Sequence, residues 1–400
     1  MGRPSAAGPH TDLPLPTAAA AAHARRLRRL VDAEITAAAG AIDFRRYMEL
    51  VLYAPGLGYY SAGARKFGAA GDFMTAPEMG PLFARCLARQ CRQILEQTGG
   101  GVILEVGAGS GVMAADLLLE LECLGSLPDR YLVLEVSADL RQRQRALLEA
   151  CIPVLLDRVH WLDTLPVEPI NGVIVANEVL DALPVHRIAT DGDRVHGLGV
   201  ERVDDGYRWC ELPLHTDVQS RCGELLALLP GRYPHGCRTE VSLDVAPWVA
   251  SFGALLGRGA ILVCDYGYPR REYYHEQRLD GTLRCQYRHR VHGDPFLYPG
   301  LQDISAAVDF TAVAGAAVGA GLAVAGFTTQ AHFLLGCDIE AVAAPLLQGD
   351  TRQRVSVSRQ IQLLTLPAGM GEMVKVMALG RGLSGPLCGF GFRDQKQRLQ

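Results

Sequence analysis

The sequence predicts an α/β fold built on a seven-stranded, mostly parallel sheet, with a helical cap before it and a β-hairpin insertion within it. A short apolar strand, Val102 to Val106, leads through a glycine turn into a helix that begins at Val112. Further apolar strands alternate with helices along the chain, which is typical of a sheet covered on both faces. The strand, turn and helix together form the first half of a nucleotide-binding unit.

The composition narrows the classes of function. The chain has 400 residues, of which 49% are hydrophobic, enough for a large α/β domain with additions. Its net charge of −4 argues against a globally basic surface for nucleic acid or anionic lipid. Eleven cysteines without a C-x-x-C pair indicate free thiols in a reducing compartment. Residues 311–327 are apolar but rich in Ala and Gly, so we expect no membrane span.

We expect four parts along the chain. Residues 1–17 hold four prolines within the first sixteen positions and are predicted to be a disordered tail. Residues 18–98 are predicted to form a helical cap with an active-site loop. Residues 99–380 are predicted to form the sheet domain, with a flap of antiparallel strands inserted at about 186–235. We expect residues 381–400 to be a loose tail.

The glycine turn and two carboxylates indicate a nucleotide site. Gly107, Gly109 and Gly111 give the spacing G-x-G-x-G, which differs from the dinucleotide pattern G-x-G-x-x-G. Glu105 precedes the turn by two residues. Glu135 ends the second strand, where nucleotide-binding folds place a carboxylate for ribose hydroxyls. Residues 154–161 are predicted to form a short third strand and turn, and Trp161 at its end is a candidate to flank an adenine.

A second informative string, N-E-V-L-D-A-L-P at 177–184, follows the fourth strand. Ligands of parallel sheets sit at the carboxyl ends of strands, so we expect Asn177, Glu178 and Asp181 to be catalytic. Glu178 and Asp181 share one side if the segment is helical. Two carboxylates there could clamp a guanidinium or accept its proton. The alternative is helix capping by Asn177 beside solvated acids.

Other segments supply further candidates. The loop before the sheet is expected to close over the site, and its predicted cofactor-binding residues are Gly71, Asp72, Thr75, Pro77 and Glu78. The predicted substrate-binding residues are Tyr59, Tyr60, Asp265, Tyr266 and His289. The tyrosine pair either lines a pocket or packs in a core. The segment around His289 is locally basic and fits no metal motif, so we predict no metal site. A groove for an acidic partner and a solvated loop both stay open as its interpretation.

Jointly, the motifs resemble those of the MidA family of S-adenosylmethionine (SAM) methyltransferases. They occur in the family's order from about residue 35 to 379, with Ser305 in place of an expected threonine. The strings that carry the resemblance are L-Y-x-P-x-x-G-Y-Y (52–60), G-D-F-x-T-A-P-E (71–78), E-x-G-A-G-x-G (105–111), N-E-x-x-D-A-L-P (177–184), D-Y-G (265–267) and G-T-L through Q-D-I (281–304). The resemblance implies a class I SAM-methyltransferase (Rossmann-like) sheet, with Glu105 at the amino end of SAM and Glu135 at its ribose.

The resemblance also implies a reaction and a partner. Mitochondrial MidA members methylate arginine on a subunit of NADH dehydrogenase during complex I assembly, so we expect a protein substrate of that kind. A small-molecule methyltransferase and a SAM-binding assembly factor without catalysis remain alternatives, whereas the glycine spacing disfavours a NAD-dependent dehydrogenase. We expect a cytoplasmic protein if the source is bacterial, or a mitochondrial-matrix protein otherwise. A homodimer is left open, and no nucleic-acid partner is expected.

Overall fold

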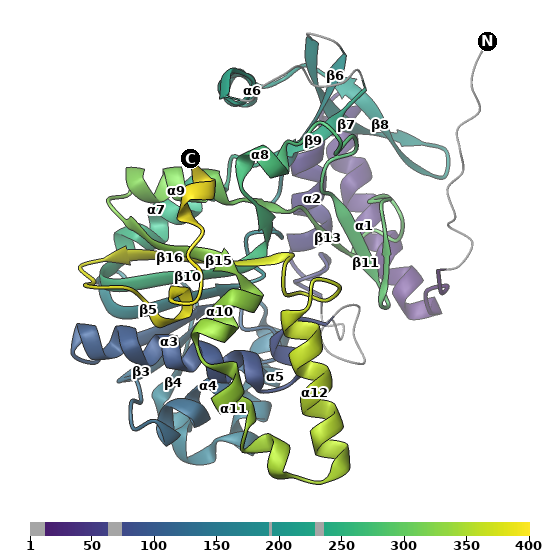
Figure 1. The fold of residues 1–400 in the computed structure, drawn as a ribbon. Coiled ribbons are helices and arrows are strands. Elements are labelled where there is room, and N and C mark those ends of the chain that lie inside the picture. The colour runs from purple at the N-terminus through teal and green to yellow at the C-terminus, as the bar shows by residue number, and fades with distance from the viewer. Residues whose placement is uncertain (1–12, 63–73, 192–193, 229–235) are drawn as a thin grey trace.

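A computed structural model describes residues 13–62, 74–191, 194–228 and 236–400 of the chain (Figure 1). A layered α/β domain occupies the lower part of Figure 1, and a smaller lobe of helices and antiparallel strands lies above it. The central sheet has the order β15-β16-β10-β5-β2-β3-β4. Its strands are β2 (Val102–Val106), β3 (Arg130–Leu134), β4 (Val159–Leu162), β5 (Ile170–Asn177), β10 (Leu256–Tyr268), β15 (Ala323–Thr329) and β16 (Val374–Arg381).

The sheet is parallel apart from β16, which runs antiparallel to both of its neighbours. All five side chains of β2 are buried, because helices cover both faces of the sheet. Ile103 packs with one face's helices and Leu104 with the other's, as the two-residue period of a strand requires. The predicted α/β fold with a mostly parallel central sheet is confirmed. The short strand β14 (Val308–Asp309) pairs with the end of β10 as an eighth strand of this sheet.

Different sets of helices cover the two faces (Figure 1). One face carries α3 (Leu82–Thr98), α4 (Val112–Cys123), α5 (Ala138–Cys151), α10 (Gln330–Gly336), α11 (Ile339–Ala343) and α12 (Thr351–Thr365). The other carries α7 (Val245–Leu255) and α9 (Phe310–Gly319). The predicted cap of 18–98 therefore needs a correction. Helix α3 belongs to the sheet domain, because its apolar stripe, with Leu87, Cys91 and Ile94, is buried in the core of that domain.

The cap and the flap form one lobe rather than two attachments. Helices α1 (Ala18–Ala37) and α2 (Phe44–Tyr53) pack on a sheet of order β1-β7-β6-β9, with β8 beside β7. The strands are β1 (Ala41–Asp43), β6 (His186–Asp191), β7 (Arg194–Val203), β8 (Gly206–Leu212) and β9 (Arg238–Val241). Strand β1 pairs antiparallel with β7, which joins the start of the chain to the insertion. Leu27, Val31 and Ile35 are buried on α1 and form its apolar stripe.

Several elements were not predicted. The third predicted strand, 154–161, is mostly a 3-10 helix (Pro153–Arg158) followed by β4. A small sheet of order β12-β11-β13 occupies the locally basic region around His289. Its strands are β11 (Arg284–Tyr287), β12 (Arg290–His292) and β13 (Asp303–Ser305). Helix α6 (Thr216–Leu228) lies between β8 and β9 in the chain, and the short helix α8 (Arg270–Tyr273) follows β10.

The predicted loose tail is also wrong for part of its length. Leu387 and Phe390 are buried in the sheet domain's core, within and beside a 3-10 helix (Cys388–Phe390). The side-chain oxygen of Gln90 on α3 accepts a hydrogen bond from the Gly389 amide at 2.9 Å. A second 3-10 helix, Lys396–Leu399, follows. Burial of these two apolar side chains, together with the hydrogen bond to Gln90, holds this part of the tail on the sheet domain.

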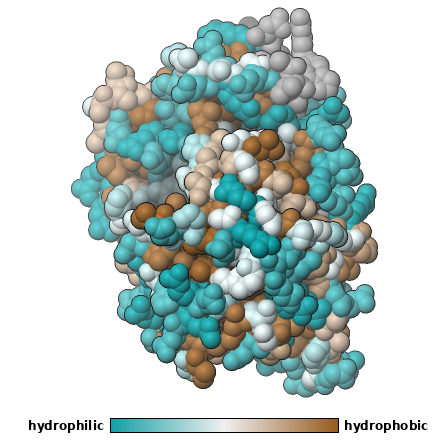
Figure 2. All heavy atoms as spheres, turned by 90° about the vertical axis from the view of Figure 1, so that its left-hand side faces the viewer, coloured by the Kyte–Doolittle hydropathy of each residue, from teal (hydrophilic) through white to brown (hydrophobic). Residues whose placement is uncertain are grey.

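No continuous apolar surface covers the face in Figure 2, and no membrane-spanning helix is found in the part of the chain that the structure describes. Figure 2 shows hydrophilic and hydrophobic side chains interspersed over one face of the molecule. Within the described ranges, the model contains no helix with both the length and the hydrophobicity needed to cross a bilayer.

Candidate active site

The chain turns sharply between β2 and α4, where three glycines adopt positive φ angles. Gly107, Gly109 and Gly111 have φ of 67°, 54° and 87°. Residues with a Cβ are strained at such angles, whereas glycine is not. Gly111 is the N-cap of α4. The turn therefore presents backbone, without side chains, to the space at the carboxyl end of the sheet.

A cavity of about 300 Å³ opens at this turn. It collects candidates from five separate segments of the sequence, as expected for the carboxyl edge of a parallel sheet. The predicted site residues that line it are Tyr60, Thr75, Pro77, Glu78, Glu105, Gly107, Gly109, Glu135, Asn177 and Glu178. Tyr53 and Ser110 also line it and were not predicted. Tyr53 precedes the tyrosine pair in the chain, and Ser110 lies within the glycine turn. Neither residue is charged, so the pattern of acidic residues did not single it out.

Glu105 is a buried acid at one end of the cavity. Its carboxylate accepts a hydrogen bond from the Tyr131 hydroxyl at 2.6 Å, and the side chain is 1% exposed. Burial raises the pKa of Glu105 to about 7, while the hydrogen bond from Tyr131 acts in the opposite direction. The carboxyl group of Glu105 therefore titrates near neutral pH, and a cationic ligand bound beside it would favour its ionised form.

Glu135 is fixed by a network centred on Gln144 of α5. The two Glu135 oxygens accept hydrogen bonds from the Ser137 amide at 2.9 Å and from Gln144 Nε2 at 3.2 Å. Gln144 Nε2 also donates to the Gly109 carbonyl at 3.0 Å, and its Oε1 accepts from the Trp161 indole at 2.9 Å. Gln144 thus links the glycine turn to the ribose candidate. Sequence reasoning missed Gln144, because a single polar residue on a predicted helix carries no pattern that marks it.

Trp161 is placed differently from the prediction. It is absent from the lining of the 300 Å³ cavity, as far as the described residues define that lining. The Arg145 guanidinium lies over its ring at 4.9 Å, and its N–H is used by Gln144. The direct role at an adenine therefore stays a prediction, and the contact observed supports Glu135 through Gln144.

The segment before α3 reaches the glycine turn. A 3-10 helix (Pro77–Met79) follows Thr75, and Ser110 of the turn donates its hydroxyl hydrogen to the Glu78 carboxylate. Thr75, Pro77 and Glu78 all line the cavity, as the predicted closing loop requires. The predictions for Gly71 and Asp72 lie outside the described residues.

Glu178 has an unusual backbone and an unusual environment. Its φ is +51°, a left-handed conformation that costs a residue with a Cβ roughly 1–2 kcal/mol. Its amide donates to the Cys264 carbonyl at 2.8 Å, which fixes it beside β10. Its Oε1 is buried and has no hydrogen-bond partner among the described residues. Burial, followed by the nearby charge of Asp265, raises the pKa of Glu178 to about 8.

The left-handed residue corrects the expectation of a helical turn. Because Glu178 is not helical, the spacing of three does not place Asp181 beside it in one pocket. Glu178 lines the first cavity, whereas Asp181 lines a second one. Burial and the charges of Asp265 and Asp303 raise the pKa of Asp181 well above its usual range. The charge of Glu178 nevertheless contributes to the raised pKa of Asp181.

Asp265 supports this segment from within the core. It is completely buried, and its Oδ2 accepts from the Val179, Leu180 and Asp181 amides at 3.1, 2.8 and 3.3 Å. Burial raises the pKa of Asp265 to about 7, although these amides lower it. The prediction of direct substrate binding is wrong for this placement, because an acid with no exposed surface holds the backbone of 179–181 instead.

The remaining substrate candidates are dispersed. Tyr60 donates to Asp303 Oδ1 at 2.7 Å and stacks on Tyr53 with ring centroids 5.6 Å apart. Tyr59 is 2% exposed and packs in the core of the cap lobe, so its packing alternative holds. Tyr266 lines the second cavity with Asp181. His289 is exposed in the turn between β11 and β12, away from both cavities as lined by described residues.

Comparisons with known proteins agree on one chemistry. A family model for S-adenosyl-L-methionine-dependent methyltransferases, Methyltransf_28, matches residues 86–328. The mitochondrial protein arginine methyltransferase NDUFAF7 of Rattus norvegicus is 28% identical over 378 residues, covering 85% of this chain and 81% of the relative. The Drosophila melanogaster homologue is also 28% identical, covering 86% and 82%.

A solved structure is similar over nearly the full length. A methyl transferase candidate from Burkholderia thailandensis, bound to S-adenosyl-homocysteine, is 44% identical, with a TM-score of 0.92. The match covers 96% of this chain and 99% of that protein. The similarity therefore includes the cap lobe as well as the sheet domain.

Proposed function

Because the chain belongs to the Methyltransf_28 family of S-adenosyl-L-methionine-dependent methyltransferases, we propose that its methyl acceptor is an arginine side chain of a protein. The methyl donor is S-adenosylmethionine. The arginine acceptor is supported by the relatives named as protein arginine methyltransferases and by the charges that surround Glu178.

The first cavity fits the methyl donor. Bound there, the donor supplies a methyl group on a positively charged sulfur. Gly107 and Gly109 leave the backbone free of side chains at the turn. The buried Glu105 carboxylate suits an ammonium group, and Glu135, held by Gln144 and Ser137, suits ribose hydroxyls.

One observation carries the choice of acceptor. Glu178 Oε1 is buried in the wall of the donor cavity without a hydrogen-bond partner among the described residues, and the charge of Asp265 raises the pKa of both Glu178 and Asp181. A buried acidic group of this kind is stabilised by a cation. The guanidinium of arginine is planar and cationic and donates several hydrogen bonds, so it suits the buried Glu178 carboxylate better than a neutral acceptor does.

The chain's residues then have separate tasks in the transfer. Asn177 and Glu178 orient the guanidinium so that a nitrogen lone pair faces the methyl carbon. As the N–C bond forms, the C–S bond breaks, its electron pair stays on sulfur, and S-adenosylhomocysteine leaves. The bound guanidinium cation favours the ionised form of Glu178. The Glu178 carboxylate then takes the proton that the nitrogen loses, and its raised pKa of about 8 makes it a stronger base than an ordinary carboxylate.

The test is a transfer assay with an unbiased acceptor pool. The purified protein is incubated with methyl-labelled SAM and with bacterial or mitochondrial lysate, and labelled residues are identified by mass spectrometry. Label on arginine supports the proposal. The resemblance to the MidA family makes a subunit of NADH dehydrogenase the first protein to examine, in the cytoplasm or the matrix. Label on small molecules alone, or SAM binding without any transfer, contradicts the proposal and favours the two alternatives.

A further inference from the structure

A second cavity, of about 260 Å³, is lined by the end of β10 and by the small sheet β12-β11-β13. No described residue lines both this cavity and the donor cavity, and the segment 179–181, whose amides bind Asp265, separates them. The volume of the second cavity is close to that of the donor cavity, so it has room for an organic molecule as well as for an ion. The proposed transfer uses none of its lining residues.

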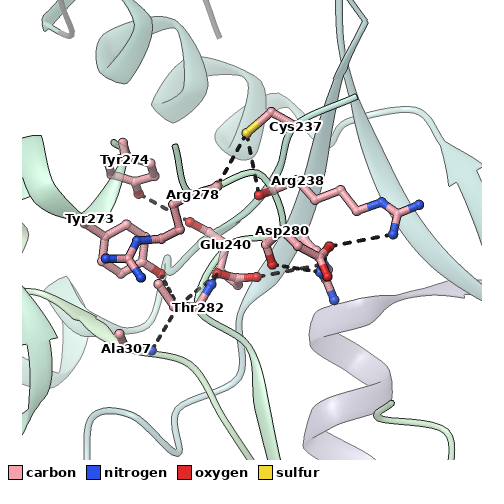
Figure 3. A network of polar contacts seen from close by, with 10 residues as sticks. Cys237, Arg238, Glu240, Tyr273, Tyr274, Arg278, Asp280, Thr282 and Ala307 are labelled. Carbon is pink, nitrogen blue, oxygen red and sulfur yellow. Dashed lines mark hydrogen bonds and ion pairs between the residues drawn. The ribbon is translucent and has the colours of Figure 1, made fainter. Parts of the chain in front are cut away.

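A buried polar network holds one wall of the second cavity (Figure 3). Glu240, completely buried on β9, accepts hydrogen bonds from the Thr282 amide and hydroxyl at 2.7 and 2.9 Å. Thr282 Oγ1 in turn accepts from the Ala307 amide at 3.0 Å. Gly281 has φ +68°, and a Cβ there would lie 2.4 Å from Glu240 Oε1. Because Gly281, Thr282 and Ala307 all line the cavity, this wall has a fixed shape.

The acids of this network are committed to two arginines outside the cavity. Arg187 Nη2 donates to Asp280 Oδ1 at 2.7 Å, and its Nε lies 3.8 Å from Glu240 Oε1. Arg238 Nη1 lies 3.6 Å from the same Asp280 oxygen. Neither Arg187 nor Arg238 belongs to the lining, as far as the described residues define it. Glu240 and Asp280 therefore neutralise the network's own cations.

Two further arginines, Arg278 and Arg284, line the second cavity and are not paired in this way. Within the described ranges, neither guanidinium has a hydrogen bond or an ion pair to another residue. The Arg278 guanidinium lies over the Tyr268 ring at 4.4 Å, which limits its freedom, and its Nε is buried. A buried donor without a protein partner is costly unless water or a ligand satisfies it. The two side chains thus offer unused donors and positive charge to the cavity.

Other polar groups of the lining are compatible with an anion. The hydroxyl groups of Tyr266 and Ser305 line the cavity and can each donate a hydrogen bond. Arg284 is near enough to Tyr266 to act on the pKa of its hydroxyl, so these two donors converge. Burial, followed by the charge of Asp265, raises the pKa of Asp181 well above its usual range, which favours the neutral form. A neutral carboxyl group does not repel an anion.

Apolar side chains complete the lining. Leu283 and Met373 contribute to it, as does Val291, which is 64% exposed. Pockets that combine apolar walls with a few convergent polar groups bind organic molecules and orient them by their polar end. The second cavity therefore suits an anion that carries an apolar body better than it suits a bare inorganic anion.

We propose that the second cavity is a binding site for a small organic anion, in which a carboxylate or a phosphate is attached to an apolar body. Arg278, Arg284 and the Tyr266 hydroxyl bind the anionic group, and Leu283 and Met373 contact the apolar body. The site is separate from the donor cavity, so both can be filled at once.

Calorimetry with four probes tests the class of ligand. Phenyl phosphate, phenylacetate, inorganic phosphate and neutral benzyl alcohol are titrated into the full chain, with saturating S-adenosylhomocysteine to fill the donor cavity. At least one aromatic anion is expected to bind about tenfold more tightly than inorganic phosphate and benzyl alcohol, because only the aromatic anions have both a charge and an apolar body. The tighter of the two identifies the anionic group. No saturable binding of either aromatic anion up to about 10 mM, or equal binding of benzyl alcohol, overturns the inference.

Variants then locate the binding. Arg278→Gln and Arg284→Gln are each expected to weaken binding of the tighter anion by about tenfold, whereas Arg284→Lys keeps the charge and should lose less. Arg354→Gln, which removes an exposed charge on α12, is the matched control and should bind like the wild type. Thermal unfolding and S-adenosylhomocysteine affinity show that each variant is folded.

Unchanged affinity in both glutamine variants, or an equal loss in Arg354→Gln, overturns the inference. These titrations involve no methyl transfer, so failure of the proposed arginine acceptor would leave their outcome unaffected.

Discussion

Asp265 binds the three backbone amides that follow Glu178 in the chain. The shortest of these bonds, from the Leu180 amide, is 2.8 Å long. Glu178 itself has φ +51° and donates its own amide to the Cys264 carbonyl. A strained residue persists only where its surroundings hold it, and here neighbouring residues of β10 do so. The position of the Glu178 carboxylate is therefore set by the sheet rather than by a flexible loop.

Glu178→Gln is expected to abolish methyl transfer while leaving donor binding intact. The amide keeps the size of the side chain but cannot accept the proton, so kcat should fall by about 100-fold or more. S-adenosylhomocysteine affinity, measured by calorimetry, should stay essentially unchanged. Glu122→Gln, an exposed acid on α4, is the matched control. Unchanged turnover in Glu178→Gln would remove Glu178 from the mechanism.

The same substitution is expected to stabilise the protein in a pH-dependent way. The pKa of Glu178 is raised from 4.5 to about 8, so the folded state binds the proton more tightly than the unfolded state does. The stability that protonated Glu178 gives the folded state is fully present below about pH 4.5 and is lost as the pH rises to about 8. Glu178→Gln should thus exceed the wild type by about 2 kcal/mol at pH 8, less than the full shift implies because the cavity admits solvent.

Urea denaturation without ligand at pH 5 and pH 8 measures this difference. The gain from Glu178→Gln should nearly vanish at pH 5, where the wild-type carboxyl is protonated when folded. A gain that is equal at both pH values, or larger at pH 5, would contradict the raised pKa.

Donor affinity is expected to follow the ionisation of Glu105. With a pKa of about 7, this carboxyl is mostly neutral at pH 6 and mostly ionised at pH 8, so S-adenosylhomocysteine affinity should rise about tenfold between them. Tyr131→Phe removes a hydrogen bond that lowers this pKa and should move the midpoint to higher pH. Calorimetric titrations of S-adenosylhomocysteine from pH 5.5 to 9 measure this midpoint. If Tyr131→Phe does not move it, the pH dependence of donor affinity does not come from Glu105.

Gly107→Ala is expected to impair donor binding beyond its effect on stability. Gly107 has φ +67° and lines the donor cavity, whereas Gly125 has φ +65° in open space after α4. Alanine at either position should cost roughly 1–2 kcal/mol of backbone strain. Only Gly107→Ala should also weaken S-adenosylhomocysteine binding. Equal affinity in the two variants would show that the turn does not approach the ligand.

Arg187→Met is expected to destabilise the cap lobe. Glu240 is fully buried, and removing Arg187 leaves its carboxylate without its neighbouring cation, at a cost of about 3 kcal/mol. The double variant Arg187→Met with Glu240→Gln should recover part of the loss, because the buried charge is then gone. Urea denaturation of both variants and of Glu240→Gln gives the coupling energy, and strictly additive effects would contradict the pairing.

The sheet domain was predictable because its strands are continuous apolar runs. Strand β2 has the predicted bounds, Val102–Val106, since it is buried on both faces. Strand β1 escaped prediction because its three residues, Ala41–Asp43, carry no period and depend on a partner near Glu201. Strands β9 and β11 likewise gain their structure from distant pairing rather than from local pattern.

The site was predictable where the rule of strand ends applies. Glu105, Glu135 and Glu178 end or follow parallel strands, so they meet at one cavity. The rule could not assign Asp181, because the left-handed φ of Glu178 turns the chain between them. Nor could it find Gln144, whose importance comes from three hydrogen bonds made across elements.

The pairing of β1 with β7 also governs how the protein is made. Ala41 faces Glu201 across this ladder, so helices α1 and α2 leave the ribosome about 160 residues before strand β7, and Cys285 and Ile304 of the same core follow later still. Over that interval their apolar stripes have no native cover, and the amino-terminal segment is the part of the nascent chain that most needs a chaperone. Translation speed across the first half of the message should therefore influence the yield of folded enzyme.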